Sequence, residues 1–271
     1  MDLSTIAISH GGEGGQVATV TLQRPLMRNA FNARSIAELT WAFSTLGKDD
    51  RVRAIVLAAE GVAFCAGADL HWMREMAQYD DAQNLADAAQ LAHMLSILYR
   101  CPHPVVARIQ GDVYAGGMGL VAACDIAVAV DTAQFCLSEV RLGLIPATIS
   151  PYVIKAMGEN AARRYFLTAE RFSAAEARRI GFLHEVVAAD VLDATVGSMV
   201  AALTSAGPHA VREAKRLVRE IGGAPIDAAL IADTAARIAA IRGSSEGREG
   251  VRAFLDKRKP SWLGAPDGDP T

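Results

Sequence analysis

The residues best suited to chemistry surround a pair of glycines, Gly116 and Gly117. An apolar helical run follows them, Leu120 to Cys124, then a β-like run, Ile126 to Val130, and then Glu139 in an otherwise uncharged neighbourhood. Glycines that open a helix leave backbone N–H groups unobstructed at the positive end of the helix dipole, which suits an anionic oxygen. A carboxylate a few residues beyond the next strand can act as acid or base. The pattern predicts an oxyanion site with one catalytic carboxylate.

A second cluster of small residues follows the predicted strand at Ala54 to Ala58. It covers residues 64–70 and reads FCAGADL. In open α/β sheets, ligands bind at the carboxyl ends of strands, so Ala68 can offer an N–H to a ligand while Asp69 caps the following turn. A tight strand-to-helix turn that binds nothing is the alternative.

Other polar residues have structural interpretations that stay open at this point. Taken alone, Glu139 is most simply a solvated residue or the ion-pair partner of Arg141. Asp69 and Asp125 are expected to cap or fix turns, and His71 is expected at the surface. The six histidines and four cysteines show no metal-ligand spacing, so no metal site is expected.

The composition indicates a globular protein with a large core. The chain has 271 residues, 51% hydrophobic and 21% charged, and a net charge of −3, which gives no general attraction to nucleic acid or anionic lipid. No apolar run approaches the ~20 residues that span a bilayer. The four cysteines lack CxxC spacing, and the first ten residues, MDLSTIAISH, carry no secretion signal. We therefore expect reduced thiols and a cytoplasmic location.

The hydrophobic pattern predicts strands and helices in alternation, typical of an α/β fold with parallel pairing and right-handed crossovers. We expect an α/β core over residues 1–190 and a helical region over 191–271. The long predicted helix offers Leu85, Leu95 and Leu98 for burial. Strands are expected at Ile6–Ser9, Val17–Leu22, Ala54–Ala58, Val105–Ile109, Ile126–Val130 and Val186–Val187; helices are expected at about Ala33–Leu46 (capped by Asn32), Ala82–Tyr99, Pro151–Met157, Asn160–Leu167, Ser173–Ile180, Asp190–Leu203, Pro208–Ile221, Ile226–Ile241 and Glu246–Lys259.

Several short motifs, in this order and spacing, resemble the crotonase, or enoyl-CoA hydratase/isomerase, superfamily over nearly the whole chain. They are Arg24-Pro25 with Asn29-Ala30, residues 64–70, Gly116-Gly117 with Cys124-Asp125-Ile126, Ala133-Gln134-Phe135, Glu139, Leu142-Gly143 with Pro146, and Glu249–Phe254 with Lys257-Arg258-Lys259. The resemblance implies a crotonase-like fold of repeated ββα units with a helical C-terminal part that forms trimers.

The resemblance also implies roles for individual residues. Ala68 and Gly116 fall where two backbone N–H groups form the oxyanion hole for an acyl-CoA thioester. Glu139 falls where a hydratase glutamate acts. Phe254 and Lys257 fall where the C-terminal helix touches CoA, often from a neighbouring subunit. We expect a glycine at 116 because a side chain there would intrude on the thioester.

The remaining predicted contacts to substrate or CoA come from two regions of the chain. They are Arg28, Ala66, Asp69, Leu70 and Gly117; Arg28 can meet a CoA phosphate or a carboxylate of the substrate. The expected partner is an acyl-CoA, bound by a homotrimer or a dimer of trimers. No cofactor is expected, because CoA enters as part of the substrate.

One departure concerns Gly119, which stands where well-known hydratases of the family carry another glutamate. A two-glutamate mechanism is therefore out of reach. The surrounding sequence is most similar to the bacterial methylglutaconyl-CoA and carboxygeranoyl-CoA hydratase branch. We expect a hydro-lyase that adds water to an α,β-unsaturated acyl-CoA, with 3-methylglutaconyl-CoA as the best match and Glu139 as the acid–base group. A Δ3-Δ2-enoyl-CoA isomerase and a non-catalytic CoA- or RNA-binding protein are the alternatives.

Overall fold

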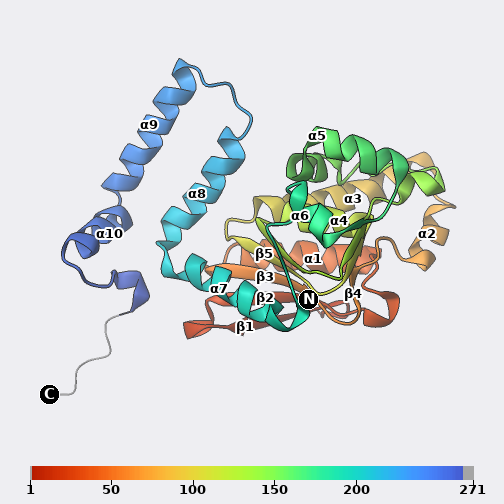
Figure 1. Cartoon of the computed structure of the whole chain (residues 1–271), viewed down its shortest axis with the longest axis horizontal. Coiled ribbons are helices and arrows are strands. Elements are labelled where there is room, and N and C mark those ends of the chain that lie inside the picture. Colours follow the sequence, from red (N-terminus) through yellow and green to blue (C-terminus); the bar gives the residue numbers. More distant parts are fainter. Residues whose placement is uncertain (1, 265–271) are drawn as a thin grey trace. The chain divides into compact units, whose positions relative to one another are not determined.

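A six-stranded sheet forms the framework of the N-terminal part of the chain (Figure 1). The computed structural model describes residues 2–264. β1 and β2 form an antiparallel hairpin, and every other neighbouring pair in this sheet is parallel. The strand order is β1 (Ile6–Gly11), β2 (Val17–Leu22), β3 (Ala54–Ala59), β5 (Val105–Ile109), β7 (Ile126–Val130) and β10 (Glu185–Val187).

A second sheet is built from very short strands that the sequence analysis did not predict. β4, β6 and β8 are mutually parallel in this order, and β9 closes the edge antiparallel to β8. Each parallel member follows a strand of the large sheet directly along the chain, so the core repeats a ββα unit, as the resemblance implied. The strands are β4 (Ala63–Cys65), β6 (Asp112–Tyr114), β8 (Gln134–Cys136) and β9 (Phe172–Ser173).

Most helices of this part agree closely with the predicted ones, but Leu70–Met76, which forms α2, had no predicted helix range. Asn32 caps α1 through a reciprocal pair of hydrogen bonds with Ser35. The break expected near residue 158 is a kink within α5, where Gly158 has φ 77°. The helices are α1 (Ala33–Leu46), α2 (Leu70–Met76), α3 (Asp81–Arg100), α4 (Gly116–Ala123), α5 (Ser150–Thr168), α6 (Ala174–Arg179) and α7 (Leu192–Ser205).

The core lies around β3, in which all six residues are buried. Of the residues in α3, only Met94, Leu95 and Leu98 are buried in this core. The expectation that Leu85 would be buried is wrong, since its side chain is 73% exposed. Helical periodicity shows which face of a helix is apolar, but it does not show how far along the helix the neighbouring elements reach.

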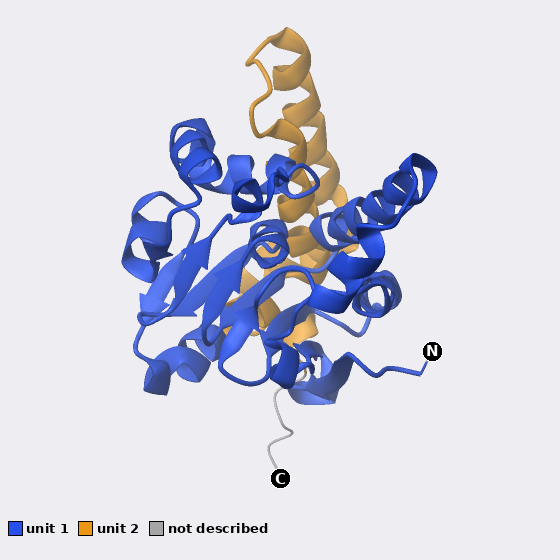
Figure 2. Ribbon diagram, turned by 90° about the vertical axis from the view of Figure 1, so that its right-hand side faces the viewer, with its two compact units in different colours: residues 1–200 blue, residues 201–271 orange. Residues whose placement is uncertain are grey.

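The chain divides into two compact units, one up to Val200 and one from Ala201, against an expected boundary near residue 190 (Figure 2). The second unit holds α8 (Pro208–Ile221), α9 (Ala228–Gly243) and α10 (Ser245–Leu255). Ala253 is the only buried residue of these three helices. Large apolar side chains stay exposed there. Over residues 2–264, no helix combines the length and apolar character needed to cross a membrane.

Candidate active site

Each of the three parallel strands of the small sheet delivers one predicted functional group just beyond its C-terminal end. Ala68 follows β4, Gly116 follows β6 and Glu139 follows β8. The strands are neighbours in the order β4-β6-β8 and run in the same direction. Their carboxyl ends therefore lie along one edge, which is where ligands bind in sheets of this kind. The structure thus brings these three residues to one edge of the sheet.

The backbone around Ala68 is held by Phe31 on one side only. The Phe31 amide donates to the Gly67 carbonyl at 2.6 Å, and the Asp69 amide donates to the Phe31 carbonyl at 2.7 Å. In such a parallel bridge the residue between the two bonded positions turns its own N–H and C=O to the other side. The Ala68 amide accordingly has no backbone acceptor within residues 2–264. It is available to a ligand.

The Gly116 amide is the first N–H of α4 and likewise finds no backbone acceptor in the described part of the chain. Ala115, just before it, adopts φ 47° and ψ −119°, an unfavourable conformation for a residue with a Cβ. The two turns touch, because an ideal Cβ on Gly67 would lie 2.9 Å from Ala115 Cβ. The residues that precede the two proposed donors are therefore packed against each other.

Glycine is needed at positions 116 and 117 for packing. An ideal Cβ at Gly116 would lie 2.9 Å from Phe31 Cε2, so the aromatic ring is the neighbour that excludes a side chain. The expected intrusion on a thioester is not needed to explain this glycine. At Gly117, which is buried, a Cβ would lie 2.8 Å from Cys65 Cβ, so this glycine lets α4 approach β4.

Glu139 opens a short 3-10 turn, Glu139–Leu142, and its Oε2 atom is buried without a hydrogen-bond partner among the described residues. Burial raises the pKa of Glu139, and a hydrogen bond from its own backbone opposes this rise only in part. The expected alternative partner, Arg141, instead donates to the Ala169 carbonyl at 2.6 Å. The ion-pair interpretation of Glu139 is therefore wrong.

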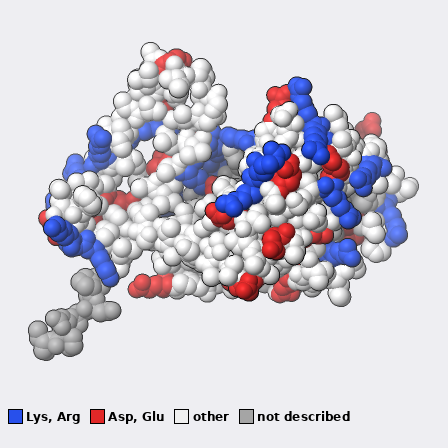
Figure 3. Space-filling view, in the orientation of Figure 1, with Lys and Arg blue, Asp and Glu red and all other residues white. Residues whose placement is uncertain are grey.

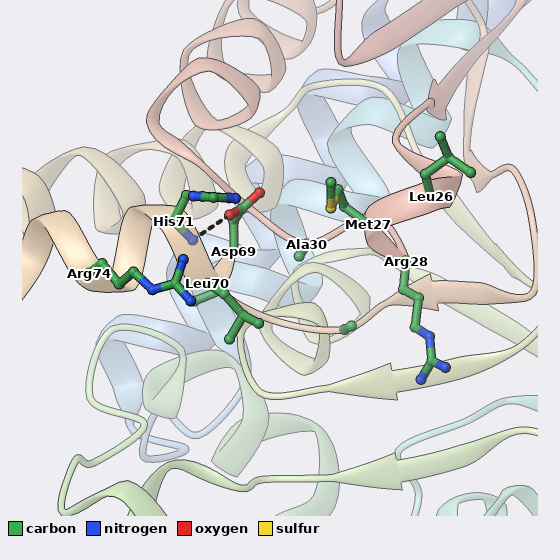
Figure 4. Close-up of a pocket in the computed structure, with 10 residues that line it drawn as sticks. Leu26, Met27, Arg28, Ala30, Asp69, Leu70, His71 and Arg74 are labelled. Atoms are coloured by element: carbon green, nitrogen blue, oxygen red, sulfur yellow. Dashed lines mark hydrogen bonds between the residues drawn. The ribbon is translucent and has the colours of Figure 1, made fainter.

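A cavity of about 410 Å³ opens beside the Ala68 turn (Figure 4). Four further predicted contact residues line it together with Ala68, namely Arg28, Ala66, Asp69 and Leu70. Leu70 is 69% exposed. Gly116, Gly117 and Glu139 are not among the residues that line this cavity. The cavity therefore adjoins the Ala68 turn and is large enough for part of a ligand.

Asp69 lines the cavity, but both of its carboxylate oxygens are already engaged. One accepts from the His71 amide at 2.8 Å and so caps α2, and the other accepts from Arg24 Nη2 at 2.6 Å. Burial alone would raise the pKa of Asp69, yet these hydrogen bonds outweigh it and lower the pKa. Asp69 thus fixes the Ala68 turn. Asp125 also has a structural role, since its carboxylate accepts a hydrogen bond from the Val105 amide at 2.7 Å.

The other two predicted CoA contacts belong to the second unit. Phe254 lies near the end of α10 and is 82% exposed. Lys257 follows the helix in the left-handed conformation, with φ 54°. Their contact with CoA stays a prediction.

Sequence reasoning missed the structural roles of two residues near the predicted ones. Arg24, quoted only as part of a motif, anchors Asp69. Ile149 fills the space in front of Gly119, where an ideal Cβ would lie 2.3 Å from Ile149 Cγ2. The partly buried Arg24–Asp69 pair and the packing of Ile149 against Gly119 are contacts between residues far apart in the chain, so local sequence carries no signal for them.

Within residues 2–264, the Ala68 and Gly116 amides have no backbone acceptor and the Glu139 Oε2 atom has no hydrogen-bond partner, a set of groups suited to binding an oxyanion and moving a proton. A sequence model described as enoyl-CoA hydratase/isomerase matches residues 12–265, and the chain belongs to this family. It is an enzyme of the enoyl-CoA hydratase/isomerase class, and an acyl-CoA substrate is consistent with this family.

Individual relatives agree with this assignment. The enoyl-CoA hydratase ACTT6 of Alternaria alternata is 35% identical over 245 residues, which cover 90% of this chain and 80% of the relative. The crystal structure of an enoyl-CoA hydratase from Shewanella pealeana is 42% identical, with a TM-score of 0.92 and coverage of 96% of both chains. One from Mycobacterium smegmatis is 35% identical, with a TM-score of 0.90, covering 96% of this chain and 100% of that one.

Proposed function

We propose that this enzyme reversibly adds water to an α,β-unsaturated acyl-CoA, with 3-methylglutaconyl-CoA as the substrate. The observation that carries the proposal is the Oε2 atom of Glu139, which is buried and has no hydrogen-bond partner among residues 2–264, at the same ends of the strands as the Ala68 and Gly116 amides. A buried carboxyl group with a raised pKa is a stronger base than one in water.

In the proposed reaction the thioester oxygen accepts hydrogen bonds from the Ala68 and Gly116 amides. These bonds strengthen as negative charge develops on that oxygen, and one such donor contributes about 3–4 kcal/mol in other enzymes. Glu139 takes a proton from water while the water oxygen forms a bond to the β-carbon. The resulting enolate then takes a proton at the α-carbon, delivered by Glu139, which returns to the carboxylate form. The Glu139 carboxylate, one water molecule and the acyl-CoA thus account for every atom of this reaction.

Two arguments lead to 3-methylglutaconyl-CoA. One is the similarity of the sequence around Gly119 to the methylglutaconyl-CoA hydratase branch, and the other is the negative charge of this substrate. Position 119 is glycine, and Ile149 fills the space that a side chain there would need, so position 119 supplies no carboxylate. A substrate with a carboxylate of its own avoids one like-charge repulsion there. Arg28 lines the cavity and supplies a cation for a CoA phosphate.

The experiment is a panel of enoyl-CoAs incubated in heavy-oxygen water and analysed by mass spectrometry. Wild type should add one labelled oxygen to 3-methylglutaconyl-CoA, and Glu139→Gln should lose at least 100-fold in rate, in the range expected for an acid–base group of roughly 10² to 10⁴. Glu159→Gln, an exposed residue paired with Arg163, is the matched control and should retain full activity. A wild type that hydrates no member of the panel contradicts the proposal.

The second candidate is a Δ3-Δ2-enoyl-CoA isomerase, which the single carboxyl group at Glu139 also favours. One group that shuttles a proton between two carbons needs no activated water. The same labelled-water experiment separates the two reactions. Conversion of a 3-enoyl-CoA with no uptake of heavy oxygen, together with no hydration of 2-enoyl-CoAs, would establish the isomerase.

A binding protein without turnover is disfavoured by the distribution of charge. On the face drawn in Figure 3, basic and acidic side chains are interspersed. Many arginines are paired with acids, such as Arg163 with Glu159 and Arg179 with Glu176. Nucleic-acid-binding proteins instead concentrate basic residues on one face. A filter-binding titration with RNA at low salt should stay flat.

We further propose a trimer or a dimer of trimers. The second unit leaves Ile226 at 87% and Phe254 at 82% exposure in a single chain, and a subunit contact would cover large apolar side chains of this kind. Light scattering coupled to size-exclusion chromatography should give a mass three or six times that of the 28.7 kDa chain. A monomer would contradict this.

A further inference from the structure

Two side chains, one on each side of Glu139 in the sequence, donate hydrogen bonds to the same carbonyl oxygen, that of Ala169. Cys136 precedes Glu139 and donates from Sγ at 3.3 Å. Arg141 follows Glu139 and donates from Nη2 at 2.6 Å, across 28 residues of sequence. The short segment that carries Glu139 is therefore tied at both ends to one point in a distant part of the chain.

Ala169 is a fixed anchor for these bonds. It is fully buried and ends α5 in the left-handed conformation, with φ 50°, and its own amide donates to the Tyr165 carbonyl at 3.2 Å. Just beyond it, Phe172 in β9 pairs with Phe135 in β8 and packs on Tyr165, with the two ring centroids 4.2 Å apart. The last carbonyls of a helix lack partners within the helix and favour a cation, so this carbonyl suits the Arg141 guanidinium.

The other hydrogen bonds around Glu139 are local. The Arg141 amide donates to the Ser138 carbonyl and the Leu144 amide to the Glu139 carbonyl, each at 3.1 Å. The carboxyl group accepts a hydrogen bond from its own backbone, and its Oε2 atom has no partner among residues 2–264. The direction of this carboxyl group therefore depends on where the backbone of the turn is held.

We propose that Arg141 is a positioning residue for the proton transfer, an inference that rests on the role proposed above for Glu139. The guanidinium of Arg141, bonded to the Ala169 carbonyl, holds the turn so that the Glu139 carboxyl group faces the reacting carbons. Arg141 acts through the backbone and not through its charge. Burial and the backbone of Glu139 itself are the causes that set the pKa of Glu139, whereas the charge of Arg141 acts on Cys136, where it partly opposes the rise in the thiol pKa that burial causes.

The first test removes the donors of Arg141. Arg141→Met keeps the length of the side chain, and because a misplacement of about 1 Å can cost about 100-fold in rate, kcat should fall about 10- to 100-fold, with KM within about threefold of wild type. Arg141→Lys still offers an N–H donor, which is all that a bond to a single carbonyl needs, and should recover most of the loss. A loss that is as large in Arg141→Lys as in Arg141→Met would overturn the inference.

The matched control is Arg164→Met. It removes an exposed arginine from the same end of α5, one that pairs with Glu170 and makes no bond to the Glu139 turn. This variant should keep the wild-type kcat. If it loses as much activity as Arg141→Met, the effect comes from the end of the helix in general, and Arg141 has no special role.

The pH dependence of kcat/KM separates positioning from charge. Loss of a nearby cation would by itself raise the pKa of a carboxyl group. A loosened turn instead admits water to Oε2, and water favours the ionised form. The midpoint for Arg141→Met should therefore lie at or below the wild-type midpoint. The charged groups around this segment are Glu139, Arg141 and Arg171, and Arg171 stays in place in every variant. A midpoint above the wild-type value would overturn the inference.

Cys136→Ala tests the same anchor from the other side of Glu139, and it carries the test if circular dichroism shows that Arg141→Met does not fold. A thiol is a weak donor, so kcat should fall less, by about three- to tenfold, and Cys136→Ser, which keeps a donor, should lose less still. Unchanged kcat in a folded Arg141→Met, or in Cys136→Ala, would overturn the inference.

The role of Arg141 and the role of Glu139 can fail separately. Full activity in Glu139→Gln refutes the part given to Glu139 in the proposed function. A loss of activity in Glu139→Gln together with wild-type kcat in Arg141→Met refutes only the positioning role of Arg141.

Discussion

The Ala115 amide donates a hydrogen bond to the Cys136 carbonyl at 2.8 Å, and this bond ties the turn that precedes Gly116 to the strand that precedes Glu139. Ala115 has φ 47° and ψ −119°, a conformation that costs of the order of 1–3 kcal/mol and persists only where the surroundings impose it. Strand pairing thus fixes the Gly116 amide relative to the chain that carries Glu139. Substitutions that shift the backbone around Ala115 by a small amount should therefore lower the catalytic rate more than they lower the stability of the fold.

Gly67→Ala should test this arrangement. Gly67 has φ +92°, and an added Cβ would lie 2.9 Å from Ala115 Cβ, so the two turns must move apart. Misplacing one oxyanion donor should lower kcat by about 100- to 1,000-fold, with a smaller change in KM. Steady-state kinetics measure this, and Gly197→Ala, where a Cβ would meet nothing within 4 Å, is the control. Unchanged kcat in Gly67→Ala would show that the donors are not held by this contact.

Glu139 should make both activity and stability depend on pH. Because burial raises its pKa, kcat/KM for hydration should rise with pH through a midpoint above the ordinary value of 4.5, as the base ionises. Stability should change in the opposite direction, since the folded state disfavours the charged form. As pH rises from 4.5 through the raised pKa, wild type should lose stability relative to Glu139→Gln. Thermal melts of both proteins over this range check the sign, and a melting difference that is constant with pH would contradict it.

Arg28 should contribute to binding of the CoA part of the substrate. It is exposed and lines the cavity beside Ala68, so a phosphate there would gain a charge-assisted hydrogen bond that salt weakens. Arg28→Ala should raise KM for acyl-CoA about five- to tenfold with little change in kcat, an effect of roughly 1 kcal/mol. The effect should shrink at high salt. Arg163→Ala, which removes an exposed arginine paired with Glu159, should leave KM unchanged.

Glu38 should make the fold sensitive to acid. Its fully buried carboxylate accepts hydrogen bonds from the Thr5 amide at 2.8 Å and the Thr5 hydroxyl at 2.6 Å, and it also pairs with Arg34. Burial opposes ionisation, but these bonds prevail and lower the pKa of Glu38 to about 2. The stabilisation should be complete above the ordinary value of 4.5 and should be lost as pH falls towards about 2.

Glu38→Gln tests this anchor of the N-terminal strand. At neutral pH it should lower the free energy of unfolding by about 1–3 kcal/mol, because buried donors lose their charged acceptor. Denaturant titrations at neutral and acidic pH measure the difference, which should narrow as pH falls below 4.5, the ordinary pKa. A difference that does not change with pH would show that the effect is one of packing.

Much of the architecture follows from local sequence. The apolar run at β5 (Val105–Ile109) and the capped, periodic segment of α1 (Ala33–Leu46) are as predicted, because period and capping act over only a few residues. The motifs also identified the family. The small sheet was not predicted, since three-residue strands such as β4 (Ala63–Cys65) are too short to show alternation and exist only through pairing with distant strands.

The sequence by itself determined which residues are candidates for chemistry: two amide-bearing turns, at Ala68 and Gly116, and one glutamate, Glu139. Tertiary structure decided how they are used. It placed Ala68, Gly116 and Glu139 at the ends of adjacent strands, directed Arg141 to the Ala169 carbonyl instead of to Glu139, and left the Oε2 atom of Glu139 buried. The physical reason is that burial and pairing depend on contacts between residues far apart in the chain. Periodicity and motif spacing describe only residues that are close in sequence, so they do not predict these contacts.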